Sequence, residues 1–289
     1  MIPSPSSHHA THAISRNVSR TLPLIALLAA PIIVTAQNPP ARTSQTAATS
    51  SAGSSELEPV ALHALQRMSE QLQRATTFSF KARIMREEPG TNGQMLDFFH
   101  YVTAQVGRPG KMRLAVVSDT SDLTLWYDGK NVTVMPVSAR MFSTLASAPT
   151  LDGTLEMLRD KMNVHTPLFP FLSSNAYQRL SQGLQSANEI GFINVGNEQL
   201  LHLAFTEADA DWQLWLTGPH EVVPRRIAII YKNVEGQPRV TIDFSDWNLN
   251  AEIPASAFMF EKPEGAVQAD WNALKPRPVE PGSKTGGDR

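Results

Sequence analysis

The chain has 289 residues, no cysteine, and 25 lysine and arginine residues against 27 aspartate and glutamate residues. The absence of cysteine excludes a disulfide framework, a cysteine-based metal site and a thiol nucleophile. The charge is nearly balanced and no basic stripe is visible, so we expect no nucleic-acid partner.

Residues 1–36 have the composition of a secretory signal peptide. Arg16 and Arg20 precede an apolar run at residues 22–34, and small residues predict cleavage near Ala36. The run is shorter than the roughly 20 residues that a bilayer span needs, and an uncleaved N-terminal anchor is the alternative. No cysteine follows, so we do not expect a lipid-anchored lipoprotein. An exported chain without cysteine is expected in a bacterial periplasm.

Two polar segments flank the predicted folded domain. Residues 37–56 are rich in Ser, Thr, Ala and Pro and are predicted to form a flexible linker. Residues 269–289 are predicted to form a disordered tail. The residues between them, 57–268, are enough for one barrel-type domain.

The predicted domain begins with an amphipathic helix and continues as an antiparallel meander. The helix is indicated by apolar residues at helical spacing, namely Ala61, Leu65, Met68 and Leu72. Alternating apolar residues predict strands at residues 78–84, 95–106, 112–116, 123–127 and 132–134. The pair Asp128-Gly129 is the strongest hairpin signal among the turns between them.

The middle of the chain changes to helical spacing and then returns to strands. Helices are predicted near residues 151–162 and 176–184, and they flank an apolar stretch at residues 167–172 with two prolines. Strands resume at residues 190–195, 201–205, 212–216, 227–231 and 240–244. We therefore predict that strands dominate residues 78–134 and 190–260, with helices only at the start and near residues 151–184.

The inserted helices are predicted to cover the concave face of a curved sheet as a lid. The expected lid residues are Leu155, Leu158, Met162, Phe169 and Phe171. Alternation assigns the following residues to the concave face as a cavity lining: Met112, Leu114, Leu125, Tyr127, Val134, Phe205, Leu214, Leu216, Ile227, Ile229, Tyr231 and Phe244. Alternation alone does not distinguish a lined cavity from a packed core, and packed interiors are the rule.

Five motifs occur here in the order in which they occur in the bacterial periplasmic lipoprotein carriers of the LolA/LolB type. They are the helix leading into Thr77-Phe78-Ser79-Phe80, the Arg108-Pro109 turn, Asp128-Gly129-Lys130, Thr166-Pro167-Leu168-Phe169, and Phe258-Met259-Phe260 before Pro263-Glu264-Gly265. The chain therefore resembles this superfamily across residues 57–268. It looks closest to the uncharacterised predicted periplasmic relatives of the carriers.

This resemblance implies a fold class and a role for one arginine. The implied fold is mainly β (α+β), with a curved antiparallel sheet forming an incomplete barrel, an N-terminal helix and a central helical lid. Arg108 matches the carrier arginine that bonds to the lid helices and holds the empty barrel shut. The alternative is an ordinary exposed turn arginine. The chain is longer than the carriers and differs in the loop at residues 87–94, so the resemblance implies binding of an acyl chain or other amphiphile more safely than transfer of lipoproteins.

Enzymatic motifs are not found in the sequence. His220-Glu221 begins like a zinc-protease helix, but Pro224 occupies the position of the second histidine. Asp243 and Asp246 are three residues apart on one strand and are expected to point to opposite faces. We therefore expect no catalytic residue, metal or cofactor.

The sequence thus predicts a periplasmic, non-enzymatic carrier for a hydrophobic ligand such as an acyl chain or a lipoprotein. The alternative is a structural or interaction module of the envelope whose barrel is filled by its own side chains. Trp126 and Trp215 alternate out of phase with the concave residues, and we expect them on the convex face under the N-terminal helix. A docking surface for an envelope protein is a second interpretation of these tryptophans.

Overall fold

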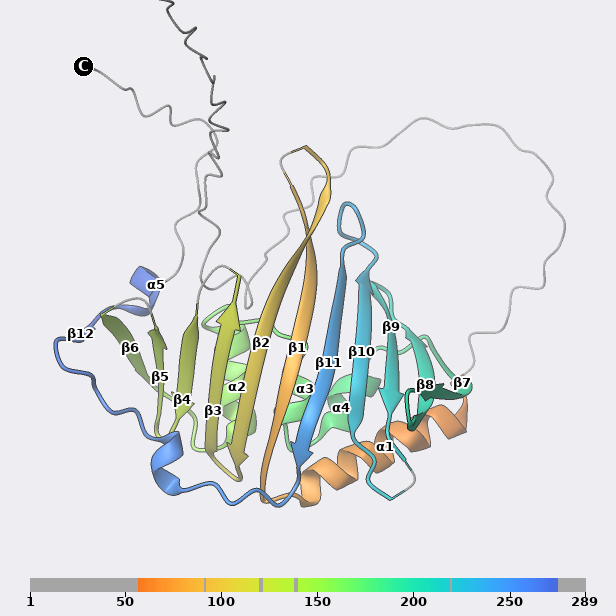
Figure 1. The fold of residues 1–289 in the computed structure, drawn as a ribbon, viewed down its shortest axis with the longest axis horizontal. Coiled ribbons are helices and arrows are strands. Elements are labelled where there is room, and N and C mark those ends of the chain that lie inside the picture. Colours follow the sequence, from red (N-terminus) through yellow and green to blue (C-terminus); the bar gives the residue numbers. More distant parts are fainter. Residues whose placement is uncertain (1–56, 91, 120–121, 138–139, 219, 275–289) are drawn as a thin grey trace, which may run out of the picture.

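A computed structural model describes residues 57–274 apart from 91, 120–121, 138–139 and 219. The predicted signal peptide and linker and most of the predicted tail lie outside the described residues. The described chain forms one open, curved sheet of twelve strands with helices against one of its faces (Figure 1). This arrangement confirms the predicted mainly β fold class.

The first half of the chain contributes one helix and six strands. Their bounds are α1 (Pro59–Arg74), β1 (Thr77–Pro89), β2 (Met95–Gly107), β3 (Lys111–Ser118), β4 (Leu123–Tyr127), β5 (Asn131–Pro136) and β6 (Met141–Ala146). The short connections between successive strands give an antiparallel meander, as the hairpin signals predicted.

The second half begins with three helices and then completes the sheet. Its elements are α2 (Leu151–Asp160), α3 (Phe169–Leu172), α4 (Ala176–Ser181), β7 (Ser186–Val195), β8 (Glu198–Thr206), β9 (Ala210–Leu216), β10 (Pro224–Tyr231), β11 (Arg239–Asn248), the 3-10 helix η1 (Ala255–Phe258), β12 (Val267–Gln268) and α5 (Trp271–Leu274). The two halves join where β11 pairs antiparallel with β1, with Ile242 opposite Ile84.

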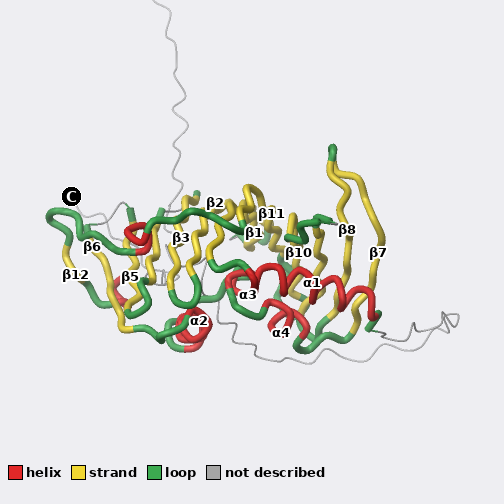
Figure 2. Tube along the Cα trace, turned by 90° about the horizontal axis from the view of Figure 1, so that it is seen from below, coloured by secondary structure: helices red, strands yellow, loops and turns green. Residues whose placement is uncertain are grey.

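The strand order is β12-β6-β5-β4-β3-β2-β1-β11-β10-β9-β8-β7. Neighbouring strands are antiparallel, except that β12 runs parallel to β6. Helices α1 to α4 all lie on one side of this sheet, which we call the inner face (Figure 2). The opposite side is the outer face. Within the described segments, no helix is long and apolar enough to cross a bilayer.

Three boundaries differ from the sequence prediction. Residues 255–258 form a 3-10 helix where a strand was predicted, and β6 was not predicted at all. Residues 271–274, predicted to be part of a disordered tail, form α5 instead. Trp271 and Leu274 are buried in the core, and the folded domain therefore extends beyond residue 268. A short helix whose apolar residues are separated by polar ones leaves little periodic signal.

Asp243 and Asp246 lie on the same face of the sheet, contrary to the prediction from their spacing. Asp246 has a φ of 53°, and the register of β1 against β11 shifts beside it, which indicates a β-bulge. Asp246 consequently pairs with Lys81 at 2.9 Å, while Asp243 pairs with Arg83 at 2.9 Å on the same outer face.

Trp126 and Trp215 also pack against side chains that were not predicted to contact them. The ring of Trp126 lies 5.2 Å from that of Phe260 in the segment after β11, and Trp215 stacks on His202 at 4.3 Å. Helix α1 lies on the inner face, so the prediction that it covers Trp126 and Trp215 was wrong (Figure 2). Its own apolar residues, including Leu65 and Met68, pack into the core.

His100 on β2 makes the stability of the fold depend on pH. It is buried, and burial, with Arg86 nearby, lowers its pKa from 6.5 to about 4. As the pH falls below 6.5, protons therefore bind His100 in the unfolded chain in preference to the folded chain. The free energy of unfolding decreases by ~3 kcal/mol once the pH is below the pKa values of both states. We expect His100→Gln to remove this loss, as measured by urea unfolding at pH 7 and pH 4.

His63→Gln is the matched control, because His63 is exposed on α1. It should lose stability with falling pH as the wild type does. Equal losses for the wild type and for His100→Gln would contradict the assignment of the pH dependence to His100.

Candidate functional site

The turn between β2 and β3 connects the sheet to the inner-face helices. The backbone N–H of Arg108 donates to the carbonyl of Thr76 at 2.8 Å, just after α1. The carbonyl of Pro109 accepts from the N–H of Leu151, the first residue of α2, also at 2.8 Å. A Cβ atom at Gly110 would lie 3.0 Å from the carbonyl oxygen of Pro149, so a larger residue would crowd this backbone contact.

The side chain of Arg108 reaches from this turn to the helices. Its Nη2 donates to the carbonyl of Ser173, just after α3, at 2.7 Å, and to the carbonyl of Leu72 in α1 at 3.5 Å. The guanidinium also lies 5.3 Å from the centre of the Phe78 ring. Burial lowers the pKa of Arg108, and the carboxylate of Asp152 opposes that effect. Arg108 is therefore a half-buried cation held mainly by backbone carbonyls.

Arg108 is not fully satisfied in this position. Its Nε is buried and has no hydrogen-bond acceptor among the described residues. A buried donor without an acceptor carries a desolvation cost of about 1–3 kcal/mol. The charge-assisted hydrogen bond from Arg108 to Ser173 therefore comes with a desolvation cost at the buried Nε of the same side chain.

Asp152 at the start of α2 holds the three inserted helices together. Its carboxylate accepts from the N–H of Ser174 at 3.0 Å and lies 3.5 Å from Arg179 of α4. Arg179 also bonds to Glu156 at 3.3 Å. We call residues 151–181, which contain α2, α3 and α4, the helical insertion.

Further hydrogen bonds fasten the helical insertion and the residues just before it to their surroundings. The N–H of Tyr177 in α4 donates to Oγ of Ser69 in α1 at 2.9 Å. The hydroxyl of Tyr127 on β4 donates to the carbonyl of Ala148, just before α2, at 2.7 Å. Oγ1 of Thr154 in α2 also hydrogen-bonds to Oγ of Ser147, just after β6, at 2.7 Å. Apolar packing supplies most of the remaining described contacts between the insertion and the sheet.

The predicted cavity-lining residues lie on the inner face, and all but two of them are buried. Ile229 and Tyr231 are half-buried at the end of β10. The predicted lid residues face them, with Phe171 packed edge-on against Phe244 at a ring distance of 5.0 Å. Met162 lies beyond the end of α2 and is half-buried. The structure therefore brings the predicted lining and lid residues together in one apolar core.

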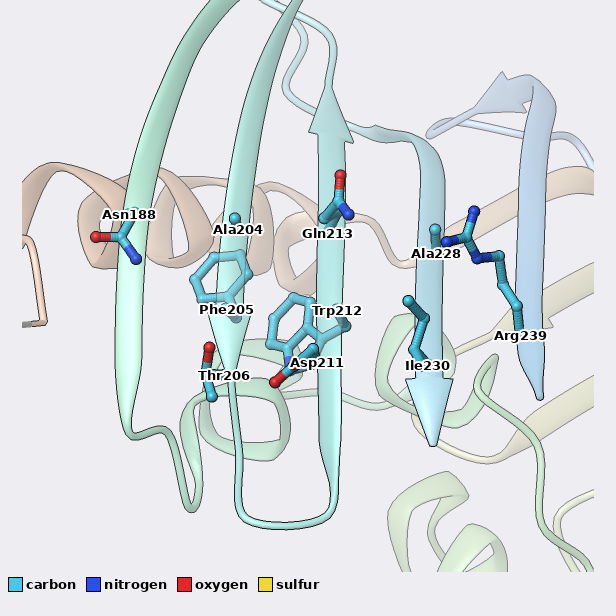
Figure 3. Close-up of a pocket in the computed structure, with 10 residues that line it drawn as sticks. All are labelled: Asn188, Ala204, Phe205, Thr206, Asp211, Trp212, Gln213, Ala228, Ile230 and Arg239. Carbon is cyan, nitrogen blue, oxygen red and sulfur yellow. The ribbon is translucent and has the colours of Figure 1, made fainter. Parts of the chain in front are cut away.

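The two pockets described here do not lie among these residues. One, of about 190 Å³, is lined by residues of β7 to β11 and by Asp211 and Arg239 (Figure 3). Phe205 is the one predicted lining residue that borders it. The other, of about 540 Å³, is an open depression bordered by His220, Glu221 and Trp247. Among the described residues, no group of three or more histidine and acidic side chains is placed to hold a metal ion.

The sequence analysis missed the polar partners of Arg108. Ser173 was not singled out, and the effect of the Asp152 carboxylate on Arg108 was not foreseen, although Asp152 was recognisable as a residue of the first turn of α2. The acceptor on Ser173 is a backbone carbonyl, which every residue has. Only the prolines and aromatic residues of the stretch at residues 167–172 indicated that the chain would turn there.

A comparison with protein-family models assigns residues 61–271 to the family described as predicted periplasmic protein DUF2092. The chain belongs to this family. The match covers nearly the whole described domain and confirms the resemblance to uncharacterised periplasmic relatives. A search of curated proteins gives no match.

Solved structures of similar proteins share little sequence with this member of the DUF2092 family. The lipoprotein LppX of Mycobacterium tuberculosis is 12% identical, with a TM-score of 0.44 over 68% of this chain and 100% of that one. LprF of Mycobacterium bovis is 13% identical, with a TM-score of 0.39 over 68% and 97% of the two chains. A LolA superfamily protein of Nitrosomonas europaea is 12% identical, with a TM-score of 0.36 over 69% and 97%.

The contact of Arg108 with Ser173 predicts a local effect of mutation. Arg108→Leu removes a charge-assisted hydrogen bond of about 1.5–3 kcal/mol without removing an apolar residue from the core. We expect hydrogen exchange across the helical insertion to become at least about tenfold faster, because 1.4 kcal/mol corresponds to a factor of ten. Exchange in β1, β2 and β11 should stay unchanged.

Arg74→Leu is the matched control. Arg74 lies at the end of α1, and its side chain is 80% exposed and pairs only with Glu70 in the described contacts. Arg108 would be an ordinary turn residue if both variants exchanged at the wild-type rate across residues 151–181.

Proposed function

We propose that this protein is a periplasmic, non-enzymatic carrier that binds the apolar chain of an amphiphile between its inner sheet face and its helical insertion. The observation that carries the proposal is the hydrogen bond from Arg108 to the carbonyl of Ser173. It joins the two sides of a mainly apolar interface. Breaking it together with a few similar contacts would release the insertion from the sheet.

The energetics of the interface support this proposal. Separating the insertion from the sheet exposes apolar surface at a cost of about 25 cal/mol per Å², so the empty protein stays closed. An acyl chain that enters the interface replaces apolar protein contacts with apolar ligand contacts. Because burial is non-directional, this replacement does not require a pocket of fixed shape in the empty protein.

Ile229 and Tyr231 mark the place where a ligand would first meet the interface. Both are half-buried on the inner face near the end of β10, whereas neighbouring Ile227 and Ile242 are buried. Tyr231 combines an apolar ring with a polar hydroxyl, as suits the boundary between a chain and its headgroup. Burial raises the pKa of this hydroxyl, so Tyr231 is a neutral donor at physiological pH.

A second candidate is a structural or interaction module of the envelope with a filled core. The burial of the predicted lining residues and the position of the two described pockets favour this function. A protein of this kind would hold its insertion closed in all its functional states. Ligand binding distinguishes the two functions.

We expect an environment-sensitive lipid probe to bind the wild type and to be displaced by fatty acid. Ile229→Lys should weaken this binding roughly tenfold or more, because a charge placed in an apolar site costs more than 1.4 kcal/mol. Fluorescence titration measures the binding, and urea unfolding checks that each variant is folded.

Ile230→Lys provides the control. Ile230 is the next residue on the same strand, faces the opposite side of the sheet and lines the pocket of about 190 Å³ (Figure 3). It should leave probe binding unchanged. If Ile230→Lys abolished binding and Ile229→Lys did not, the ligand would occupy the pocket of about 190 Å³ that Ile230 lines. A folded wild type that binds no probe would favour the filled module.

A further inference from the structure

The sheet ends at one side in an edge strand with exposed apolar residues. β7 is the last strand of the sheet, and it forms a hairpin with β8 that stands away from the helices (Figure 2). Phe192 is 64% exposed and Val195 is 52% exposed, and Ile190 and Ile193 are also exposed. Single exposed apolar residues are ordinary, but four of them within six residues of an edge strand are not.

The first part of this edge is covered by the chain itself. Leu57 forms a parallel bridge with Ala187, and the N–H of Glu58 donates to the carbonyl of Ala187 at 2.9 Å. The carboxylate of Glu58 then accepts from the N–H of Glu189 at 2.7 Å. Beyond Glu189, no other described strand pairs with β7 on this side. Residues 190–195 therefore form the open part of the edge.

This open part has a β-bulge at its start, between Glu189 and Gly191, but lacks the charges and prolines that protect many edges. Residues 190–197 read Ile-Gly-Phe-Ile-Asn-Val-Gly-Asn and contain neither a charged residue nor a proline. Charges, prolines and very short strands are the usual protection against edge-to-edge pairing. The other end of the sheet has such protection, because β12 consists of two residues.

We propose that residues 191–195 of β7 pair antiparallel with the same residues of a second copy of this chain, forming a two-fold symmetric dimer. A two-fold axis normal to the sheet keeps each side chain on its own face, so the axis lies at a residue and its own copy. With the axis at Ile193, the pairing places Ile193 opposite its copy and Phe192 opposite Asn194 of the second copy. Glu189 and Glu198 lie outside the paired stretch, so no like charges stand opposite each other.

Pairing through this edge gives a closed dimer and not an open filament. Among the described strands, β7 offers the one long edge without charge or proline, so pairing through it closes at two subunits. Both faces of the open strand carry apolar residues, which the pairing buries on both sides of the joined sheet. Leu57 and Val60 at the start of α1 are also exposed beside β7 and extend the apolar surface.

Sedimentation of the purified full chain over a range of concentrations tests the dimer. We expect the wild type to dimerise and Phe192→Lys to weaken dimerisation by about tenfold or more, since the substitution adds a protecting charge to the edge. The matched control is Val117→Lys on β3, because Val117 is an exposed apolar strand residue at 54% exposure. It should dimerise as the wild type does.

Disulfide trapping tests the register, because the chain has no cysteine of its own. Ile193→Cys should cross-link to its own copy, and a mixture of Phe192→Cys with Asn194→Cys should cross-link too, since directly opposite residues bring their Cα atoms within the roughly 7 Å that a disulfide allows. Val195→Cys alone should not, because its two copies lie four residues apart along the paired strands, on the order of 14 Å at about 3.4 Å per residue.

A wild type that is monomeric at all concentrations and forms no cross-link would overturn the dimer, even if another protein were found on β7. The dimer does not rest on the proposed function. Phe192→Lys should bind the lipid probe as the wild type does, so the two proposals fail separately.

Discussion

The constraint on which this structure depends is the apolar inner face of an open sheet. Twelve strands that do not close into a barrel leave one face whose leucine, isoleucine and phenylalanine side chains must be buried by something else. Here α1 and the helical insertion supply that cover. Because the helices occupy the inner face, the hydrogen bonds of Arg108 to the helices lie on that side. Trp126 and Trp215 are instead covered by Phe260 and His202.

The two sides of the sheet are stabilised differently. On the outer face, Asp243 accepts hydrogen bonds from Arg83 and from Arg226 across three adjacent strands. Burial alone would raise the pKa of Asp243, but these two hydrogen bonds hold it below its usual value. The inner face has apolar packing and a few polar contacts at the turn that contains Arg108. Movement of the helices would therefore leave the strands joined by their outer-face contacts and their backbone ladder.

Much of this architecture is readable in the sequence. Alternation identified the inner-face residues of β3, β4, β9 and β10, since a period of two assigns each residue to a face. The bulge at Asp246 breaks that period, so the sequence placed Asp243 and Asp246 on opposite faces. The acceptor for Arg108 was not predictable, because a carbonyl such as that of Ser173 has no residue-type signal. Trp271 and Leu274 lie in a polar segment, and their burial depends on distant strands.

Carrier function requires that the interface between the inner face and the helical insertion accept an apolar chain. Native mass spectrometry of the protein isolated from the periplasm of its own cells tests this claim most directly. We expect a population of molecules heavier than the polypeptide by the mass of one amphiphile. This population should shrink for Ile229→Lys but not for Ile230→Lys. A spectrum with the polypeptide mass alone, from protein that also gains no mass when incubated with fatty acid, would contradict this claim.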